Sequence, residues 1–166
     1  EIIVDGTNST LNLYPHIKVG TASVPVDGTI ALIAKSGGKI NLLDSNDIET
    51  NGKESHGIVL TDTGTILTGT SGGNHSFKTT GDGSATFYVK DASLNLGSSN
   101  TVDVYATGDK SIGVYNDHGT ITLGAAGGSY EVGTNGVILY NSGGGTINTA
   151  GTNFTVGDGS IKKKKK

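Results

Sequence analysis

One phrase of this sequence returns at nearly constant intervals. Residues 113–123, GVYNDHGTITL, come back in altered form at 137–148 as VILYNSGGGTIN, and weaker copies lie at 32–42, 58–67 and 87–96. Each copy contains two groups of apolar residues, and one residue of the second group is taken as the anchor of that copy. With a shorter copy near the start included, the anchors are Leu11, Ile40, Ile66, Leu94, Ile121 and Ile147. These anchors are 29, 26, 28, 27 and 26 residues apart. A repeat of this length without helical periodicity predicts a solenoid of β-coils.

Each repeat contains two clear strand patterns and a third that is less regular. The alternation of apolar and polar residues that marks a strand is plainest at 119–123. There Ile121 and Leu123 would face inward, and Thr120 and Thr122 would face outward. The first strand is predicted at 30–34, 58–61, 86–90, 112–116 and 137–141, and the third at 17–19, 48–50, 77–79, 102–105, 130–132 and 154–156. Parallel crossovers are strongly biased to the right hand. The prediction is therefore an all-β, right-handed, three-sided parallel β-helix of about six coils of about 27 residues.

The main alternative fold is an antiparallel sandwich or barrel. Such a fold also consists of many short strands joined by glycine-rich turns. It gives no reason, however, for one phrase to return every 26 to 29 residues. The repeat therefore favours the β-helix.

Stacked coils would place equivalent residues in columns. We predict one interior column at Ile33, Val59, Phe87, Val114 and Leu139, a second at the anchors, and a small corner residue two positions before most anchors, at Gly38, Gly64, Ala92, Gly119 and Gly145. Pro15 and Pro25 interrupt the first coil. The predicted organisation is an irregular first coil at 1–27, regular coils at 28–161 and a lysine tail at 162–166.

Charge and composition narrow the possible partners. The net charge of −3 combines 15 acidic residues with 12 lysines, five of which form the run at 162–166, so the rest of the chain is acidic. An acidic body argues against nucleic acid as a partner. The absence of cysteine excludes disulfides and thiolate metal sites. The chain starts at Glu1 and has no signal peptide or long apolar run, so we expect it to be a segment of a longer protein.

The residues that could carry chemistry do not form a recognisable catalytic set. Many β-helix enzymes act on polysaccharides with clustered carboxylates and a basic group, and Asp117-His118 is the pair that comes nearest to this. It occupies a turn position that Ser or Thr holds in other repeats, and there is no arginine to clamp an anion. We predict no enzyme activity, no metal site and no cofactor.

Two binding activities known for repetitive β-folds require regular patterns that this sequence lacks. Calcium sites in nonapeptide β-rolls require a nine-residue rhythm, so Asp82-Gly83 and Asp158-Gly159 are predicted to be turns. Ice binding would require regular Thr pairs beside the anchors. The predicted outward pairs are Lys39/Asn41, Thr65/Leu67, Ser93/Asn95, Thr120/Thr122 and Thr146/Asn148. These pairs are not uniform, and ice binding is not favoured.

Three tyrosines recur at one position of the repeat. Tyr88, Tyr115 and Tyr140 each follow an inward residue of the first strand, so alternation directs them outward. They are the candidate binding residues, because exposed rings can stack on a sugar or on a partner side chain. The alternative is that ring stacking between coils only stabilises the solenoid.

The phrases at 113–121 and 137–141 resemble passenger repeats of the large type V autotransporter adhesins of Gram-negative bacteria. The resemblance covers about residues 28–160. It implies a passenger fragment: a β-helical stalk displayed outside the cell and anchored to the outer membrane by a C-terminal barrel that this chain does not include. It further implies a non-enzymatic role in cell adhesion, with a host-cell or microbial surface protein or glycan as the partner. A carbohydrate-active enzyme fragment and a purely structural stalk are the alternatives.

The two ends of such a stack would carry unpaired strand edges. Unpaired edges are templates for association with another chain. The sequence therefore also predicts possible end-to-end self-association.

Overall fold

The computed structural model describes residues 1–70, 72–97, 99–124, 127–149 and 153–165, and in this part of the chain there are strands and turns but no helix. The strands form three parallel sheets. The seven-stranded sheet contains β1 (Ile2–Asp5), β4 (Ile30–Lys35), β7 (His56–Thr61), β10 (Ala85–Lys90), β13 (Ile112–Asp117), β16 (Val137–Ser142) and β19 (Ile161–Lys165). The second sheet contains β2 (Thr10–Leu13), β5 (Lys39–Leu42), β8 (Ile66–Gly69), β11 (Ser93–Asn95), β14 (Thr120–Leu123) and β17 (Thr146–Thr149). The third contains β3 (His16–Val19), β6 (Asn46–Thr50), β9 (Asn74–Thr79), β12 (Thr101–Ala106), β15 (Ser129–Val132) and β18 (Asn153–Val156).

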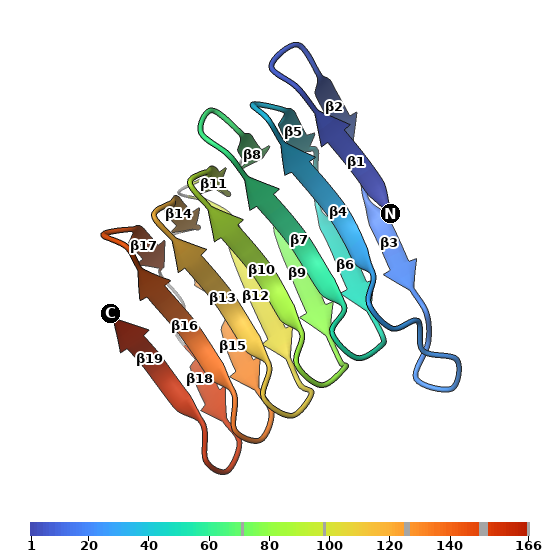
Figure 1. Cartoon of the computed structure of the whole chain (residues 1–166), viewed down its shortest axis with the longest axis vertical. Coiled ribbons are helices and arrows are strands. Elements are labelled where there is room, and N and C mark those ends of the chain that lie inside the picture. Colours follow the sequence, from blue (N-terminus) through green and yellow to red (C-terminus); the bar gives the residue numbers. More distant parts are fainter. Residues whose placement is uncertain (71, 98, 125–126, 150–152, 166) are drawn as a thin grey trace.

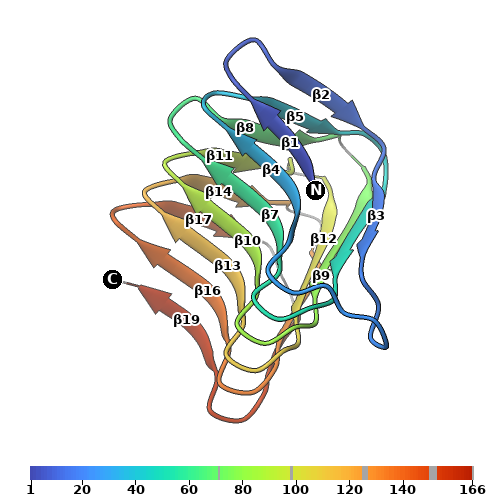
Figure 2. The same cartoon turned by 45° about the vertical axis from the view of Figure 1, so that its right-hand side comes forward.

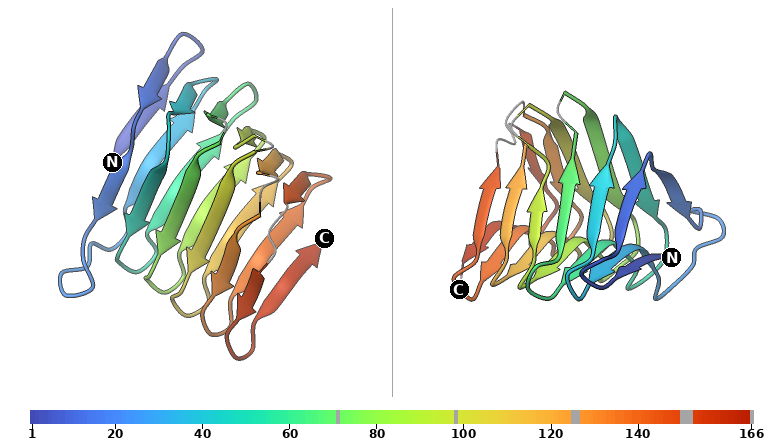
Figure 3. Two further views of the ribbon diagram at one scale, coloured as in Figure 1. Left: turned by 180° about the vertical axis from the view of Figure 1, so that it is seen from behind. Right: turned by 90° about the horizontal axis from the view of Figure 1, so that it is seen from above.

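The chain winds through the three sheets in the same order in every coil. In Figure 1 it rises through a strand of the seven-stranded sheet in front, passes to the back through the second sheet, and descends through the third. Each coil lies farther from the N-terminus than the one before it, and Figure 2 shows the same course from nearer the N-terminal end. This winding is right-handed, and the views from behind and above show the coils side by side (Figure 3). The predicted right-handed three-sided parallel β-helix is confirmed.

The three sheets enclose one hydrophobic core, in which inward side chains of successive coils stack on one another. Fully buried members include Leu32, Ile40, Phe77, Phe87 and Leu94, all with 0–1% exposure. Phe77 of β9 and Phe87 of β10 make an edge-to-face contact with ring centroids 4.7 Å apart. Burial of large apolar side chains from all three sheets supplies the main driving force for winding the chain.

Two of the predicted columns are one residue out of register in the early coils. In the second sheet Leu67, and not Ile66, pairs with Ile40 and Leu94 and is fully buried. Ala34 pairs with Leu60, and Lys39 pairs with Ile66. The turn from Leu60 to Ile66 is therefore one residue longer than the equivalent turn from Ala34 to Lys39. The extra residue moves Thr65, and not Gly64, to the buried corner.

The first interior column needs the same correction. Its members in the second and third coils are Leu32 and Ile58, which are fully buried, whereas Ile33 and Val59 lie in the register of the outward tyrosines. Both positions hold two adjacent apolar residues, so the apolar pattern alone fits either register. Phe87, Val114 and Leu139 are in the predicted interior column.

The turn from the third sheet back to the first is built from a Gly-x-x-Ser phrase. It occurs at 52–55, 81–84, 108–111 and 157–160. The Ser84 hydroxyl accepts the Ser55 N–H at 3.2 Å and donates to the Gly52 carbonyl at 3.3 Å, and Ser55, Ser111 and Ser160 make equivalent bonds to the preceding coil. These serines satisfy buried backbone groups at a corner that the sheets leave unpaired. Asp82-Gly83 and Asp158-Gly159 lie in these turns, as predicted.

The glycine of this phrase is required by close stacking. A Cβ on Gly81 would lie 1.5 Å from the carbonyl oxygen of Gly52, and a Cβ on Gly108 would lie 2.2 Å from that of Gly81. Gly52 approaches Val26 in the same way, at 2.0 Å. The backbones of successive coils therefore touch along this edge, where no larger residue fits.

Both ends of the chain are more regular than the sequence indicated. Residues 1–27 contain β1, β2 and β3, which pair in register with the second coil, and the irregular part follows β3. Lys162–Lys165 form most of β19, which pairs with β16 from Val137↔Ile161 to Asn141↔Lys165.

A buried histidine makes the stability of the third sheet dependent on pH. His75 is 1% exposed, contacts the Asn46 side chain and stacks on Phe77. Burial lowers the pKa of His75 below its usual value, and bonds to Asn100 and the Thr70 backbone oppose this only in part. Below about pH 6.5 the unfolded chain takes up a proton that the folded chain resists, so this stability is present above that pH and is lost as the pH falls.

We therefore expect the free energy of unfolding to fall between pH 7.5 and pH 5 in urea titrations. His75→Asn, which repeats the residue found at Asn46, should flatten this slope. The pH dependence that remains should come from the half-buried His56, because burial also lowers its pKa. His16→Asn, on an exposed surface, serves as the control. An unchanged slope in His75→Asn would show that His75 is protonated equally in both states.

Candidate functional site

The predicted tyrosine column exists on the outer face of the seven-stranded sheet. Tyr88 pairs with Tyr115 and Tyr115 with Tyr140 in the ladder. The ring centroids are 5.1 Å and 4.8 Å apart and the ring planes differ by only 14° and 9°. The three rings thus form one continuous stack, and all three are half-buried.

Stacking changes the surroundings of the central ring most. Tyr115 has a tyrosine on each side. Burial raises the pKa of the Tyr115 hydroxyl, and the neighbouring Tyr140, Asp117 and Tyr88 raise it further. The hydroxyl is therefore a neutral hydrogen-bond donor and acceptor at physiological pH.

The tyrosine column continues toward the N-terminus as an aliphatic column. The same register is held by Ile3, Ile33 and Val59, in that order from the first coil to the third. Ile3 is 55% exposed, whereas Val59 is 9% exposed. Sequence reasoning missed these members, because Ile33 and Val59 were predicted to face inward.

A second outward column lies beside the first. Between the two columns lie Ala31, Thr86 and Ile138, each directly before a residue of the interior column. Strict alternation would turn these three residues outward, but they are buried, and the printed strand pairs omit them. This interruption of the alternation turns the next residues toward the N-terminus outward: Ile30, His56, Ala85, Ile112, Val137 and Ile161. The two columns together are named the apolar face.

The other two outer faces differ in chemistry. The second sheet presents an amide and hydroxyl column, Asn12, Asn41, Thr68, Asn95, Thr122 and Asn148. In it Asn41 donates to Asn12 and Thr68 donates to Asn41, both at 2.8 Å. The predicted outward pair Thr65/Leu67 is wrong here, since Ile66 and Thr68 are the outward residues. Ile66 and Lys39 still interrupt the polar array.

The third sheet is the charged face. Lys18 and Glu49 form an ion pair at 3.5 Å, and the same column continues through Lys78, Tyr105 and Glu131. Burial raises the pKa of Tyr105, and the negative charges of Asp103 and Glu131 add to this. Of the three outer faces, that of the seven-stranded sheet is the most apolar, although His56 lies in its second column and Ala85 there is only 6% exposed.

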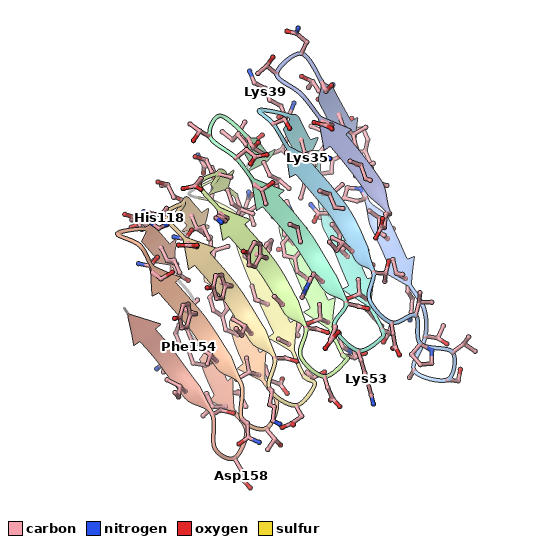
Figure 4. The ribbon with its side chains drawn as sticks, viewed as in Figure 1. Lys35, Lys39, Lys53, His118, Phe154 and Asp158 are labelled. Atoms are coloured by element: carbon pink, nitrogen blue, oxygen red, sulfur yellow. The ribbon has the colours of Figure 1, made fainter. Side chains whose placement is uncertain are left out.

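Polar groups border the apolar face where its strands end. Figure 4 looks onto this face, with Lys35 and His118 at its edge. Lys35 pairs with Asp5 at 3.3 Å, and His118 Nδ1 lies 2.6 Å from Asp117 Oδ1. The Ser142 hydroxyl approaches the Asp117 carboxylate at 3.4 Å. An activated nucleophile requires the hydroxyl to bond to the imidazole, so this arrangement does not favour acyl transfer.

The surface has an open groove beside the turns that follow the third sheet. This groove of about 420 Å³ is lined by residues that include Thr21, Pro25, Asn51 and Thr80. Among the described residues, no group of three or more His, Asp or Glu side chains could hold a metal ion. The same part of the chain has no helix suited to crossing a bilayer.

The geometry defines a class of protein, a right-handed parallel β-solenoid with three chemically distinct faces. Comparison of the chain with protein families, with curated proteins and with solved structures finds no match.

Proposed function

We propose that this chain is a non-enzymatic segment of a surface-displayed adhesin passenger of the autotransporter kind, and that its apolar face binds the partner. The observation that carries the proposal is one unbroken outward register of apolar and aromatic residues on the apolar face, namely Ile3, Ile33, Val59, Tyr88, Tyr115 and Tyr140. Large exposed apolar patches on soluble proteins mark interaction surfaces. The partner is a host-cell or microbial surface protein or glycan, and the working location is the cell surface, anchored at the outer membrane in the full-length protein.

The stacked tyrosines are the centre of this face. Tyrosine provides a large contact area with few rotatable bonds, and the column holds each ring between neighbours before any partner arrives. A preorganised ring loses little conformational entropy on binding. The polar border at Lys35, Asp117 and His118 then resembles the polar rim of known interfaces.

A purely structural stalk is the second candidate. The near-parallel rings at 4.8–5.1 Å favour it, because this contact alone stabilises neighbouring coils. The two candidates differ in what happens when the rings are removed.

The triple variant Tyr88→Thr, Tyr115→Thr, Tyr140→Thr separates them. Threonine retains strand propensity, so the fold should remain while binding to epithelial cells or a glycan array falls by at least about tenfold, as for loss of a hot spot. The matched control is Asn95→Ser, Thr122→Ser, Asn148→Ser on the second sheet, which should bind normally. A folded tyrosine variant with unchanged binding, compared with the control, would leave the structural stalk as the function.

A further inference from the structure

The tyrosine column brings together three oxidisable side chains that lie 27 and 25 residues apart in the sequence. Tyr88 stacks on Tyr115 with ring centroids 5.1 Å apart, and Tyr115 stacks on Tyr140 at 4.8 Å. We propose that this column is an oxidative cross-linking site, at which a peroxidase-type oxidant joins Tyr115 to Tyr88 or to Tyr140 as dityrosine. Either bond fastens two adjacent coils covalently.

The other three tyrosines of the chain have different neighbours. Tyr130 faces the core and is 1% exposed. Tyr105 lies on the charged face, in ladder register between Lys78 and Glu131. Tyr14 follows β2 directly and is 66% exposed. The tyrosine column is therefore the place where one phenol ring lies against another phenol ring of the same chain.

The geometry of the column suits carbon–carbon coupling. The strands pair in register at Tyr88↔Tyr115 and Tyr115↔Tyr140, so successive rings leave the backbone at the same height. The centroids of two directly bonded phenol rings are only slightly closer than those of the stacked rings. Rotation about χ2, which is a soft torsion in tyrosine, turns two neighbouring rings edge to edge and brings together the carbons beside their hydroxyls. The rings lie on the outer face, so this rotation displaces no core residue.

The central ring, Tyr115, is the one from which an electron is most easily removed. The electron-rich faces of the rings on both sides stabilise positive charge that develops on it. Burial raises the pKa of Tyr115, and the negative charge of Asp117 is among the groups that raise it further. That charge opposes loss of the proton alone but favours loss of the electron. We therefore expect Tyr115 to be oxidised first and to take part in either coupled pair.

The coupling is balanced with hydrogen peroxide as the final oxidant. A haem peroxidase removes one electron and one proton from Tyr115 and the same from a neighbouring ring, and hydrogen peroxide takes up both electrons and both protons to become two molecules of water. The two phenoxyl radicals pair their unpaired electrons in one new carbon–carbon bond between ring positions ortho to the hydroxyls. The hydrogens of these two carbons then move to the oxygens, which restores both phenols. The product is lighter than the starting chain by two hydrogen atoms.

A cross-link at this position supplies covalent stabilisation that the chain otherwise lacks. The sequence contains no cysteine, so no disulfide can join its coils. In a solenoid each coil contacts its nearest neighbours, and the stack can open locally between two coils. A bond from Tyr115 to either neighbouring tyrosine closes that opening and also restricts the unfolded chain, as a disulfide does.

Oxidation of the full chain with a haem peroxidase and hydrogen peroxide tests the site. Tyr14→Phe serves as the parent, because the exposed Tyr14 ring can couple between chains. At low protein concentration the monomer should gain dityrosine fluorescence and lose the mass of two hydrogen atoms. Acidic residues separate the three tyrosines of the column in the sequence. Mass spectrometry after cleavage at these acidic residues should therefore find Tyr115 in every linked pair.

Phenylalanine variants of the parent identify the shared ring. Tyr115→Phe keeps the ring stack but removes the phenol that both pairs have in common, so it should lose both cross-links. Tyr88→Phe and Tyr140→Phe are the matched controls, and each should retain one cross-link. The purified cross-linked monomer should also unfold in urea with an equilibrium constant lower by about a hundredfold, as for a disulfide that closes a loop of similar length.

Oxidation in urea separates the effect of stacking from the reactivity of tyrosine itself. In the unfolded chain, Tyr115 should no longer be preferred over Tyr105 and Tyr130. Absence of dityrosine from the folded monomer overturns the proposal, as does undiminished cross-linking in Tyr115→Phe. Equal stability of the cross-linked and untreated chains overturns the fastening of the coils. None of these measurements uses cell binding, so the cross-linking site and the proposed adhesive function fail separately.

Discussion

Gly81→Ala is expected to destabilise the solenoid more than any other change of one methyl group. The added Cβ would lie 1.5 Å from the Gly52 carbonyl oxygen, and both groups belong to the backbone. No side chain can rotate away, so the two coils must separate locally and lose ladder and serine hydrogen bonds. We expect a loss of about 3–5 kcal/mol or a failure to fold, as for severe overpacking, measured by urea unfolding followed by circular dichroism.

Gly144→Ala is the control for this prediction. Gly144 has a φ of +75° and open space around its Cβ position. Alanine there incurs only the strain of the left-handed conformation, about 1–2 kcal/mol. Equal losses in the two variants would mean that the coils do not approach as closely as the structure shows.

The same close stacking explains why the fold could be predicted from the repeat. Each coil must fit on the one before it, so the chain must present a turn, a strand and an inward residue at nearly equal intervals. The anchors Leu11, Ile40, Leu94, Ile121 and Ile147 were assigned correctly for this reason. Parallel pairing and the right-handed winding follow from the repeat length together with the general preference of crossovers.

Register was harder to predict where a turn changed length. The connection between Leu60 and Ile66 contains one residue more than its equivalent in the preceding coil, and the strand after it starts with two adjacent apolar residues. The interior side of a strand can be inferred only from alternation, and alternation does not distinguish such pairs. The same ambiguity hid Ile33 and Val59 from the predicted binding face.

The apolar face was found only in part for a second reason. Tyr88, Tyr115 and Tyr140 follow alternation and were recognised. The second column was not, because the strands change side at Ala31 and Thr86, where two successive residues are buried. That change depends on how the sheet bends around the core, which a local pattern does not record. The pairing of β19 is likewise a tertiary effect, since a lysine run has little intrinsic preference for a strand.

Leu67→Ala is expected to cost about 2–5 kcal/mol, the usual range for removing a fully buried leucine. Leu67 is 0% exposed between Ile40 and Leu94, so truncation leaves a cavity between three coils. Ile66→Ala, one residue earlier and on the outer face, should cost about 1 kcal/mol or less. Urea unfolding of the two variants compares the register of the structure with the register predicted from the repeat.

The reverse order of these two losses would place Ile66 inside and shift this coil by one residue. Thr68 would then leave the column that it forms with Asn41, to which it donates at 2.8 Å. The apolar face provides a second check on the same coil, because Val59 must remain in line with Tyr88 for the column to be continuous. Since that continuity carries the proposed function, measuring the register of the third coil also tests the basis of the binding face.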